Sequence, residues 1–467
     1  DDQSIYGWRG AKIENIQRFT QDFAATHTVR LEQNYRSTQT ILQAANAVIA
    51  FNFGRLGKEL WTAGESGESI TLYAGFNEQD EARFIVEQLE QWLDAGNNRA
   101  SAAILYRSNA QSRVLEEALI RAAIPYRIYG GQRFYERMEI RNALAYLRLL
   151  LNRGDDAAVE RVINTPPRGI GSKTLDTVRD CARSRGVSMW QAIALVTEEK
   201  LLPARALSAL QGFVVLINEL DTGTDELLLE EVVEQVIQAS SLIDFHEKEK
   251  GERGQARVEN LEELVSAAKQ FAPEGDELSP LQQFLDSAAL DAGDAQADEH
   301  EDSVQLMTLH SAKGLEFPLV FLAGMEENLF PHRMSLEEPG RLEEERRLCY
   351  VGITRAMEKL MITYAESRRL HGSETFNTPS RFIREIPAEL LQEVRLHTTV
   401  SRPVSSITQA QVPETELCLG QRVYHQIFGE GVVLNFEGRG ASARVEVNFD
   451  AEGSKWLVLQ YANLQLI

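Results

Sequence analysis

The 467-residue sequence has few cysteines, no long apolar run and a shortage of positive charge. Its three cysteines, Cys181, Cys349 and Cys418, are scattered and match no CxxC spacing, which argues against a metal site or a disulfide framework and fits a reducing compartment. No apolar run approaches the ~18 residues that a membrane span needs, so we expect no membrane partner. The net charge of −22 argues against a protein that coats DNA generally, although a local groove can still bind nucleic acid.

The sequence also lacks an initiator methionine and a phosphate-binding loop. It opens with DDQSIYGWRGA, which does not resemble a targeting peptide, and we interpret the chain as a fragment. The segment Thr165–Thr174 (TPPRGIGSKT) superficially suggests a phosphate loop, but Gly171 is followed by Ser172 before Lys173, which breaks the pattern G-x-x-x-x-G-K-[ST]. We therefore expect no nucleotide site built on such a loop within this chain.

The distribution of apolar residues indicates an α/β fold with additions. Val304–Leu309 and Leu319–Leu322 are typical of buried parallel strands. Small and polar residues follow the first run, at the carboxyl edge where open α/β sheets place ligands. From about Gln132 long helical patterns dominate until sheet signals resume near Val304, which predicts a mostly helical insertion. Short alternating strands with glycine turns over Leu419–Ile467 predict a small SH3-like or Tudor-like β-barrel.

Four motifs together resemble a known family. They are DDQSIYGWRGA at the start, LEQNYRST at Leu31–Thr38, TLHSAKGLEF at Thr308–Phe317 and VGITRA at Val351–Ala356. They resemble the third to sixth motifs of superfamily 1 DNA helicases in the UvrD/Rep/PcrA group. The resemblance implies a RecA-like, P-loop NTPase type parallel sheet domain, split by the helical insertion and followed by the barrel. The expected boundaries are 1–31 for the remnant of a first RecA-like domain, 32–131 and 303–399 for the two parts of the second, 132–302 for the insertion, 400–415 for a linker and 416–467 for the barrel.

The resemblance implies ATP as the nucleotide and assigns its contacts residue by residue. Gln3 would reach the γ-phosphate, Tyr35 would stack on the adenine, and Glu316 would hydrogen-bond the nucleotide. Arg36 and Arg355 would act as arginine fingers, and with Gln3 they form the expected catalytic set. Two cations aimed at one phosphoryl group suit a reaction that is catalysed mainly by positioning and electrostatics. The phosphate loop and the DExx segment that binds Mg²⁺ would lie upstream, so we expect no metal ligand in this chain and no ATP hydrolysis by it alone.

The resemblance also assigns two DNA contacts. Aromatic faces stack on bases at about 1–3 kcal/mol each, whatever the sequence, and an adjacent arginine can pair with phosphate. In the insertion, the Gly-Ile-Gly turn resembles a helix-hairpin-helix whose backbone N–H groups bind a duplex phosphate, although a plain loop with a good N-cap explains it equally well. The expected residues are Tyr6, Trp8, Arg9, Thr308 and His310 for the single strand, and Arg168, Gly169, Gly171 and Lys173 for the duplex.

These assignments predict an ATP-dependent 3′→5′ DNA helicase and translocase that acts on single-stranded DNA and on junctions with duplex. The family implies DNA replication, mismatch repair and nucleotide excision repair, with repair proteins as partners and a bacterial cytoplasmic, nucleoid-associated location. The sequence does not decide between a monomer and a homodimer. The barrel resembles barrels that bind RNA polymerase. Two alternatives remain: a RecB/AddA-like helicase–nuclease, disfavoured because a short barrel follows the sixth motif, and a non-catalytic DNA- or RNA-polymerase-binding module with relic motifs.

Overall fold

The computed structural model divides into two compact units, Asp1–Val394 and Arg395–Ile467. Trp8 and Arg9, two of the expected DNA-binding residues, lie outside the described residues, as does the expected linker 400–415. The structure describes residues 2–7, 10–11, 15, 18–19, 22–23, 26–53, 55, 57–222, 224, 227–249, 251–273, 275, 278–293, 301–338, 340–370, 373–394, 421–426, 428–437, 444–449, 453–458, 462 and 464–466.

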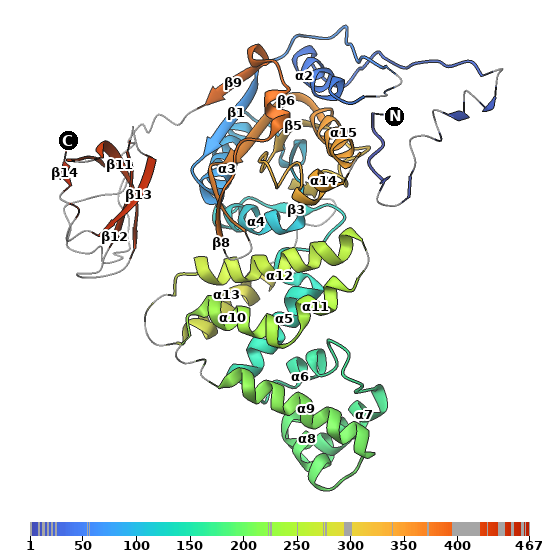
Figure 1. Cartoon of the computed structure of the whole chain (residues 1–467), viewed down its shortest axis with the longest axis vertical. Helices are drawn as coiled ribbons and strands as arrows, with labels where there is room; N and C mark the ends of the chain where they lie inside the picture. Colours follow the sequence, from blue (N-terminus) through green and yellow to red (C-terminus); the bar gives the residue numbers. More distant parts are fainter. Residues whose placement is uncertain are drawn as a thin grey trace. The chain divides into compact units, whose positions relative to one another are not determined.

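A seven-stranded sheet with the order β3-β4-β2-β5-β6-β1-β9 forms the centre of the first unit (Figure 1). All of its neighbouring strands run parallel. Its inner strands β2 and β5 are almost entirely buried, which explains their continuous apolar runs. The predicted parallel α/β sheet is thereby confirmed. The strands are β1 (Ile70–Gly75), β2 (Ala102–Tyr106), β3 (Tyr126–Ile128), β4 (Val304–Thr308), β5 (Phe317–Leu322), β6 (Ala356–Ala365) and β9 (Leu391–Val394).

Helices cover both faces of this sheet and create two separate apolar cores. On one face, α2 (Gln39–Ala50) and α15 (Arg341–Ile353) pack over the sheet, and on the other α3 (Glu78–Asp94) and α4 (Ser112–Arg121) do so. Successive residues of a strand point to opposite faces, so that β5 supplies Val320 and Leu322 to one core and Leu319 and Phe321 to the other.

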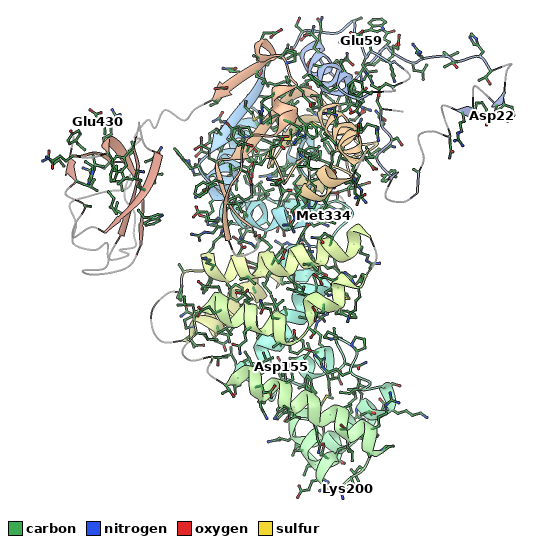
Figure 2. All side chains as sticks on the ribbon, viewed as in Figure 1. Asp22, Glu59, Asp155, Lys200, Met334 and Glu430 are labelled. Carbon is green, nitrogen blue, oxygen red and sulfur yellow. The ribbon has the colours of Figure 1, made fainter. Side chains whose placement is uncertain are left out.

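The chain leaves the sheet after β3 and returns to it at β4, and the described residues between form nine α-helices and the short 3₁₀ helix Phe134–Glu136. They share a single apolar core that includes Phe213 and Leu264. In Figure 1 and Figure 2, which share one view, this helical layer lies next to α4, and α12 runs along the boundary between the layer and the α/β part. The helices are α5 (Met138–Leu151), α6 (Asp156–Val162), α7 (Ser172–Arg185), α8 (Met189–Glu198), α9 (Ala204–Asp221), α10 (Leu229–Ala239), α11 (Leu242–Glu247), α12 (Glu252–Gln270) and α13 (Pro280–Gly293).

The end of the first unit differs from the sequence-based expectation. The segment Thr378–Phe382 (TPSRF) and the residues after it suggest a helix that closes the core, but α16 (Arg381–Arg384) is a single turn and the chain then forms β9, which pairs with β1. Pro387 explains the early end, because the residue before a proline is disfavoured in helical conformation. A two-stranded hairpin, β7 (Ser367–Leu370) with β8 (Ser373–Phe376), and the short helix α14 (Arg333–Glu337) were not predicted either.

The second unit is a five-stranded antiparallel sheet with the order β13-β12-β11-β10-β14, which confirms the predicted small β-domain. Its core contains four valines and Phe449, with Phe428 packed against it. Tyr424 and Trp456 are each 41% exposed on its surface. No described helix of either unit has the length and apolar composition to span a membrane. The strands are β10 (Arg422–His425), β11 (Gly429–Glu437), β12 (Arg444–Phe449), β13 (Gly453–Val458) and β14 (Gln465–Leu466).

Candidate nucleotide and nucleic-acid sites

The carboxyl end of α15 brings the two predicted finger arginines together. Arg355 is buried, and its Nε and Nη1 donate to the carbonyls of Val351 and Leu315 at 3.0 and 2.9 Å. Arg36, far away in the sequence, donates from Nη1 to the carbonyl of Thr354 at 3.2 Å. The last carbonyls of a helix lack intrahelical partners and carry partial negative charge, so they stabilise cations. The helix end therefore holds both guanidinium groups in one place.

This pair of cations has one half-exposed counter-ion. Glu316 Oε2 lies 2.5 Å from Arg36 Nε, and the two side chains are 51% and 27% exposed. An ion pair this open to water contributes about 0–1 kcal/mol. Burial and then the charge of Arg36 lower the pKa of Arg355 to about 10, which Glu316 only partly opposes. The site therefore carries an excess of positive charge that a phosphate group could neutralise.

The loop that carries Arg36 is fixed to the sheet by a turn around Asn34. The side-chain oxygen of Asn34 accepts the backbone N–H groups of Arg36 and Ser37 at 2.8 and 2.9 Å. Ser37 Oγ in turn donates to the carbonyl of Ala356, the first residue of β6, at 2.6 Å. Tyr35 is 85% exposed, and its hydroxyl donates to Gln33 Oε1 at 2.9 Å. An exposed aromatic ring thus lies next in sequence to a fixed arginine, as stacking on an adenine requires.

The segment that contains Gln3 lies against the same unit. Gln3 is exposed, and its carbonyl accepts a hydrogen bond from Lys313 Nζ at 2.8 Å. Arg347 Nε donates to the carbonyl of Ser4 at 2.9 Å, and Lys313 Nζ lies 5.1 Å from the ring centre of Tyr6. Lys313 is one of the small and polar residues predicted to lie at the carboxyl edge of the sheet, but no role was assigned to it, and Arg347 was not predicted.

Three of the predicted single-strand contacts gather at the carboxyl end of β4. Thr308 is the last residue of β4 and stands in register with Tyr106 on β2. Its Oγ1 lies 3.0 Å from Ser311 Oγ. The Tyr6 hydroxyl donates to the carbonyl of His310 at 3.5 Å. The expected position at the sheet edge is therefore occupied by an aromatic ring, a hydroxyl and an imidazole on adjacent elements.

In the Gly-Ile-Gly loop, the guanidinium of Arg168 is bound inside the protein. Its Nη2 donates to the Tyr146 hydroxyl at 2.6 Å and its Nη1 to the carbonyl of Val162 at 3.0 Å. It also lies over the Phe213 ring, 5.9 Å from the ring centre. These contacts join the loop to α5, α6 and α9, so the structure gives Arg168 a structural position and leaves its predicted DNA contact untested.

The rest of this loop has an open surface. Gly169 adopts a φ of +81°, which favours glycine, and Gly171 is the N-cap of α7 with no side-chain cap. A Cβ atom at either glycine would meet nothing within 4 Å. Lys173 lies exposed in the first turn of α7. This end of α7 is accessible to a phosphate group, and its predicted role in duplex binding stays a prediction.

A cluster of arginines on the helical layer was not predicted. Arg141 and Arg148 are exposed and seven residues apart on α5, and Arg161 is half-buried on α6. Burial and the charges of Arg141 and Arg148 lower the pKa of Arg161. The Arg161 Nε–H is buried and has no hydrogen-bond partner in the part of the chain that the structure describes. The seven-residue spacing of arginines on one predicted helix was the available sequence signal.

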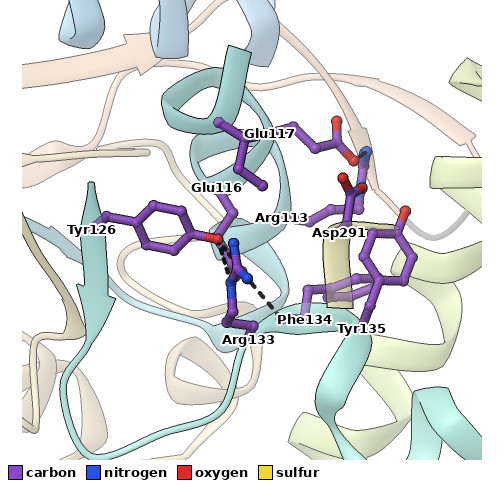
Figure 3. A pocket seen from close by; sticks show the side chains of 9 residues that line it. Arg113, Glu116, Glu117, Tyr126, Arg133, Phe134, Tyr135 and Asp291 are labelled. Carbon is purple, nitrogen blue, oxygen red and sulfur yellow. Dashed lines mark hydrogen bonds and ion pairs between the residues drawn. The ribbon is translucent and has the colours of Figure 1, made fainter. Parts of the chain in front are cut away.

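A pocket at the point where the chain leaves the sheet is closed by its own polar groups (Figure 3). Arg133 Nε donates to the Tyr126 hydroxyl at 2.8 Å, and this hydroxyl donates to Glu116 at 3.2 Å. The backbone N–H of Phe134 donates to the same carboxylate at 3.3 Å. Burial raises the pKa of Glu116 despite these contacts. The described residues also contain no group of three or more His, Cys, Asp or Glu side chains suited to a metal ion.

The parallel sheet, its helical insertion and the arginine pair at the end of α15 define a RecA-like domain of the kind found in superfamily 1 helicases. Comparison with known families agrees. The model of the UvrD-like helicase C-terminal domain matches residues 29–367, that of the PcrA/UvrD tudor domain matches 419–465, and that of the UvrD/REP helicase N-terminal domain matches 1–24. The chain belongs to the UvrD-like helicase family.

Individual relatives support this assignment along the whole chain. DNA helicase II of Salmonella typhimurium and that of Escherichia coli are each 59% identical over 472 residues, which cover 100% of this chain and 66% of the relative. The ATP-dependent DNA helicase PcrA of Staphylococcus epidermidis is 41% identical over 99% of this chain and 65% of its own length. The chain therefore spans about two thirds of the length of these relatives.

Proposed function

We propose that the protein acts as an ATP-dependent 3′→5′ DNA helicase and translocase of the UvrD type. The observation that carries this proposal is the pairing of Arg36 and Arg355 at the end of α15, with Glu316 beside them. Two arginines from distant motifs form a cationic site that lacks one full counter-charge, as a γ-phosphate site requires. In the proposed reaction both guanidinium groups stabilise negative charge on the transferred phosphoryl group, which in comparable enzymes raises the rate by about 10³–10⁵.

The other nucleotide contacts follow from position. Tyr35 offers an exposed ring for the adenine, and Gln3 lies exposed at the edge of the same unit. When the nucleotide binds, the Glu316 carboxylate leaves Arg36 and accepts a hydrogen bond from a hydroxyl group of the nucleotide. ATP supplies the phosphoryl group, and the proposed ligands of Mg²⁺ are carboxylate and hydroxyl groups of the DExx and phosphate-loop motifs, which do not occur in this sequence.

The proposed DNA contacts lie on two parts of the first unit. Tyr6, Thr308 and His310 line the carboxyl edge of the sheet and contact the single strand. The open turn before α7 and the arginine cluster on α5 and α6 contact the phosphates of duplex ahead of the junction, since such contacts fix position without reading sequence. A change in the γ-phosphate contacts then alters the affinity for the single strand, as in other nucleotide switches.

The biological setting that we propose follows from the relatives. They are bacterial proteins named DNA helicase II. For the whole protein we propose a role in replication, mismatch repair and nucleotide excision repair, in the cytoplasm near the nucleoid. Repair proteins and a second copy of the chain are candidate partners. The tudor-type domain, with exposed Tyr424 and Trp456, is a candidate surface for RNA polymerase.

ATP hydrolysis with and without single-stranded DNA tests the proposal. We expect turnover, stimulated by DNA, from the chain extended upstream to the length of its relatives, and none from the chain as it stands. Arg36→Ala lowers the turnover of the extended chain by about 10³-fold. Arg185→Ala, an exposed arginine on α7, is the matched control and leaves it unchanged.

Two further outcomes discriminate the alternatives. If the extended chain binds DNA but hydrolyses no ATP, the protein is a binding module with relic motifs, and the second unit becomes the part to test against RNA polymerase. Duplexes with a 3′ or a 5′ single-stranded tail test the polarity, and efficient unwinding from the 5′ tail alone contradicts the 3′→5′ assignment.

A further inference from the structure

We propose that Thr354 is a positioning residue that holds the two finger arginines relative to each other. The inference rests on the proposed function, because it concerns how Arg36 and Arg355 present their charge to a γ-phosphate. Thr354 directly follows Ile353, the last residue of α15, and is 1% exposed. It cannot contact solvent or a bulky ligand itself, so any effect on catalysis must pass through its neighbours.

Thr354 contacts both guanidinium groups through two chemically different atoms. Its Oγ1 accepts a hydrogen bond from Arg355 Nη2 at 3.1 Å and donates to the carbonyl of Val351 at 3.0 Å. Its backbone carbonyl accepts from Arg36 Nη1 at 3.2 Å. One residue thus links two cations that would otherwise repel each other.

The hydroxyl is the part of this link that fixes the plane of Arg355. A guanidinium is a rigid fork, and Arg355 is held at Nε by Val351, at Nη1 by Leu315 and at Nη2 by Thr354. Loss of the hydroxyl removes one of these three directions and leaves a buried N–H without its partner. The Thr354 carbonyl remains, so the contact with Arg36 is preserved. The consequence of losing the hydroxyl should therefore be confined to Arg355.

Thr354→Val and Thr354→Ser test this inference in the chain extended upstream. The readout is the preference for a non-hydrolysable ATP analogue over ADP, because the finger arginines contact the phosphate that ADP lacks. We expect Thr354→Val to lower this preference by about 10-fold, as for a lost hydrogen bond to a charged group. Thr354→Ser keeps the hydroxyl and should therefore retain the preference for the ATP analogue over ADP. Thr363→Val is the matched control, since it removes another buried threonine hydroxyl, one that donates to Glu81 at 2.7 Å.

Combining variants separates positioning from a general loss of structure. In an Arg355→Ala background Thr354→Val should add nothing, whereas in an Arg36→Ala background its full effect should persist. Equal effects of Thr354→Val with and without Arg355, or an equal effect of Thr363→Val, would overturn the inference. A wild-type protein that does not prefer the ATP analogue to ADP refutes the proposed function itself, and this outcome is visible before any variant is made.

Discussion

Arg113 forms a buried ion pair between the α/β part and the helical layer. Replacing it by methionine should destabilise the first unit strongly. It lies on α4, is 2% exposed, and its Nε pairs with Glu263 on α12 at 2.7 Å. Its Nη2 donates to Gln270, also on α12, at 2.7 Å. Arg113→Met keeps much of the volume but leaves Glu263 buried without its cation. Breaking a buried pair in this way costs about 3–5 kcal/mol.

The loss should depend on pH with a defined sign. Burial raises the pKa of Glu263, and the charge and hydrogen bond of Arg113 oppose this rise. Without Arg113 the pKa of Glu263 rises further, so the native state binds its proton more tightly than the unfolded chain does. Between the ordinary value of 4.5 and the raised native pKa, stability therefore falls as pH rises, by up to about 1.4 kcal/mol per pH unit. The variant should be less impaired at pH 5 than at pH 7.

Urea unfolding at pH 5, 6 and 7 measures both effects. Arg185→Met is the control, because Arg185 and Glu199 form a pair of similar length, 2.8 Å, that is exposed and should contribute about 0–1 kcal/mol. Adding Glu263→Gln to Arg113→Met should remove the extra pH dependence. The reasoning is refuted if Arg113→Met loses no more stability than the control, or if its loss is the same at all three pH values.

Three other outcomes follow from the contacts described above. Asn34→Ala should lower ATP turnover of the extended chain about 10-fold with little change in melting temperature, because the backbone of Arg36 loses its turn; unchanged turnover contradicts it. Arg168→Met should lower the melting temperature, whereas Lys173→Ala should lower affinity for duplex DNA alone; the reverse pattern would reassign both residues. Burial raises the pKa of Glu259, but its hydrogen-bond partners lower it to about 2. The native protein therefore loses stability as the pH falls from 4.5 to 2. In Glu259→Gln this loss of unfolding free energy should be smaller, by up to roughly 3 kcal/mol.

The sheet was predictable because it leaves a local signal, and the residues proposed to face the nucleotide were chosen from motifs. A strand buried on both faces, such as β5, requires a continuous apolar run, and the small residues after β4 mark the carboxyl edge. Arg36 and Arg355 were found through motifs in the sequence. The structure adds what no motif carries, namely that both arginines meet at the carbonyls of one helix end.

The parts that escaped prediction depend on distant partners. The edge strand β9 has four residues and is defined by its pairing with β1, which local sequence cannot reveal. Helices α8 and α9 were predicted only as part of the helical insertion, and the way they pack into its shared core depends on the other helices. Arg168 borders a glycine turn, and its hydrogen bond to the Tyr146 hydroxyl on α5 joins residues 22 positions apart, which the local sequence does not reveal.

The arginines proposed to bind an anion have cations as neighbours, whereas the other buried arginines have carboxylates as neighbours. Arg113 and Arg368 are both buried, and neighbouring carboxylates raise the pKa of each above its ordinary value despite that burial. Among the described residues, burial and neighbouring cations lower the pKa of an arginine at Arg355, beside Arg36, and at Arg161, in the arginine cluster of the helical layer. A cation held near like charges is stabilised by an added anion, whereas one already paired with carboxylates gains little. The same electrostatic environment thus occurs at the proposed γ-phosphate site and at the proposed duplex contact on α5 and α6.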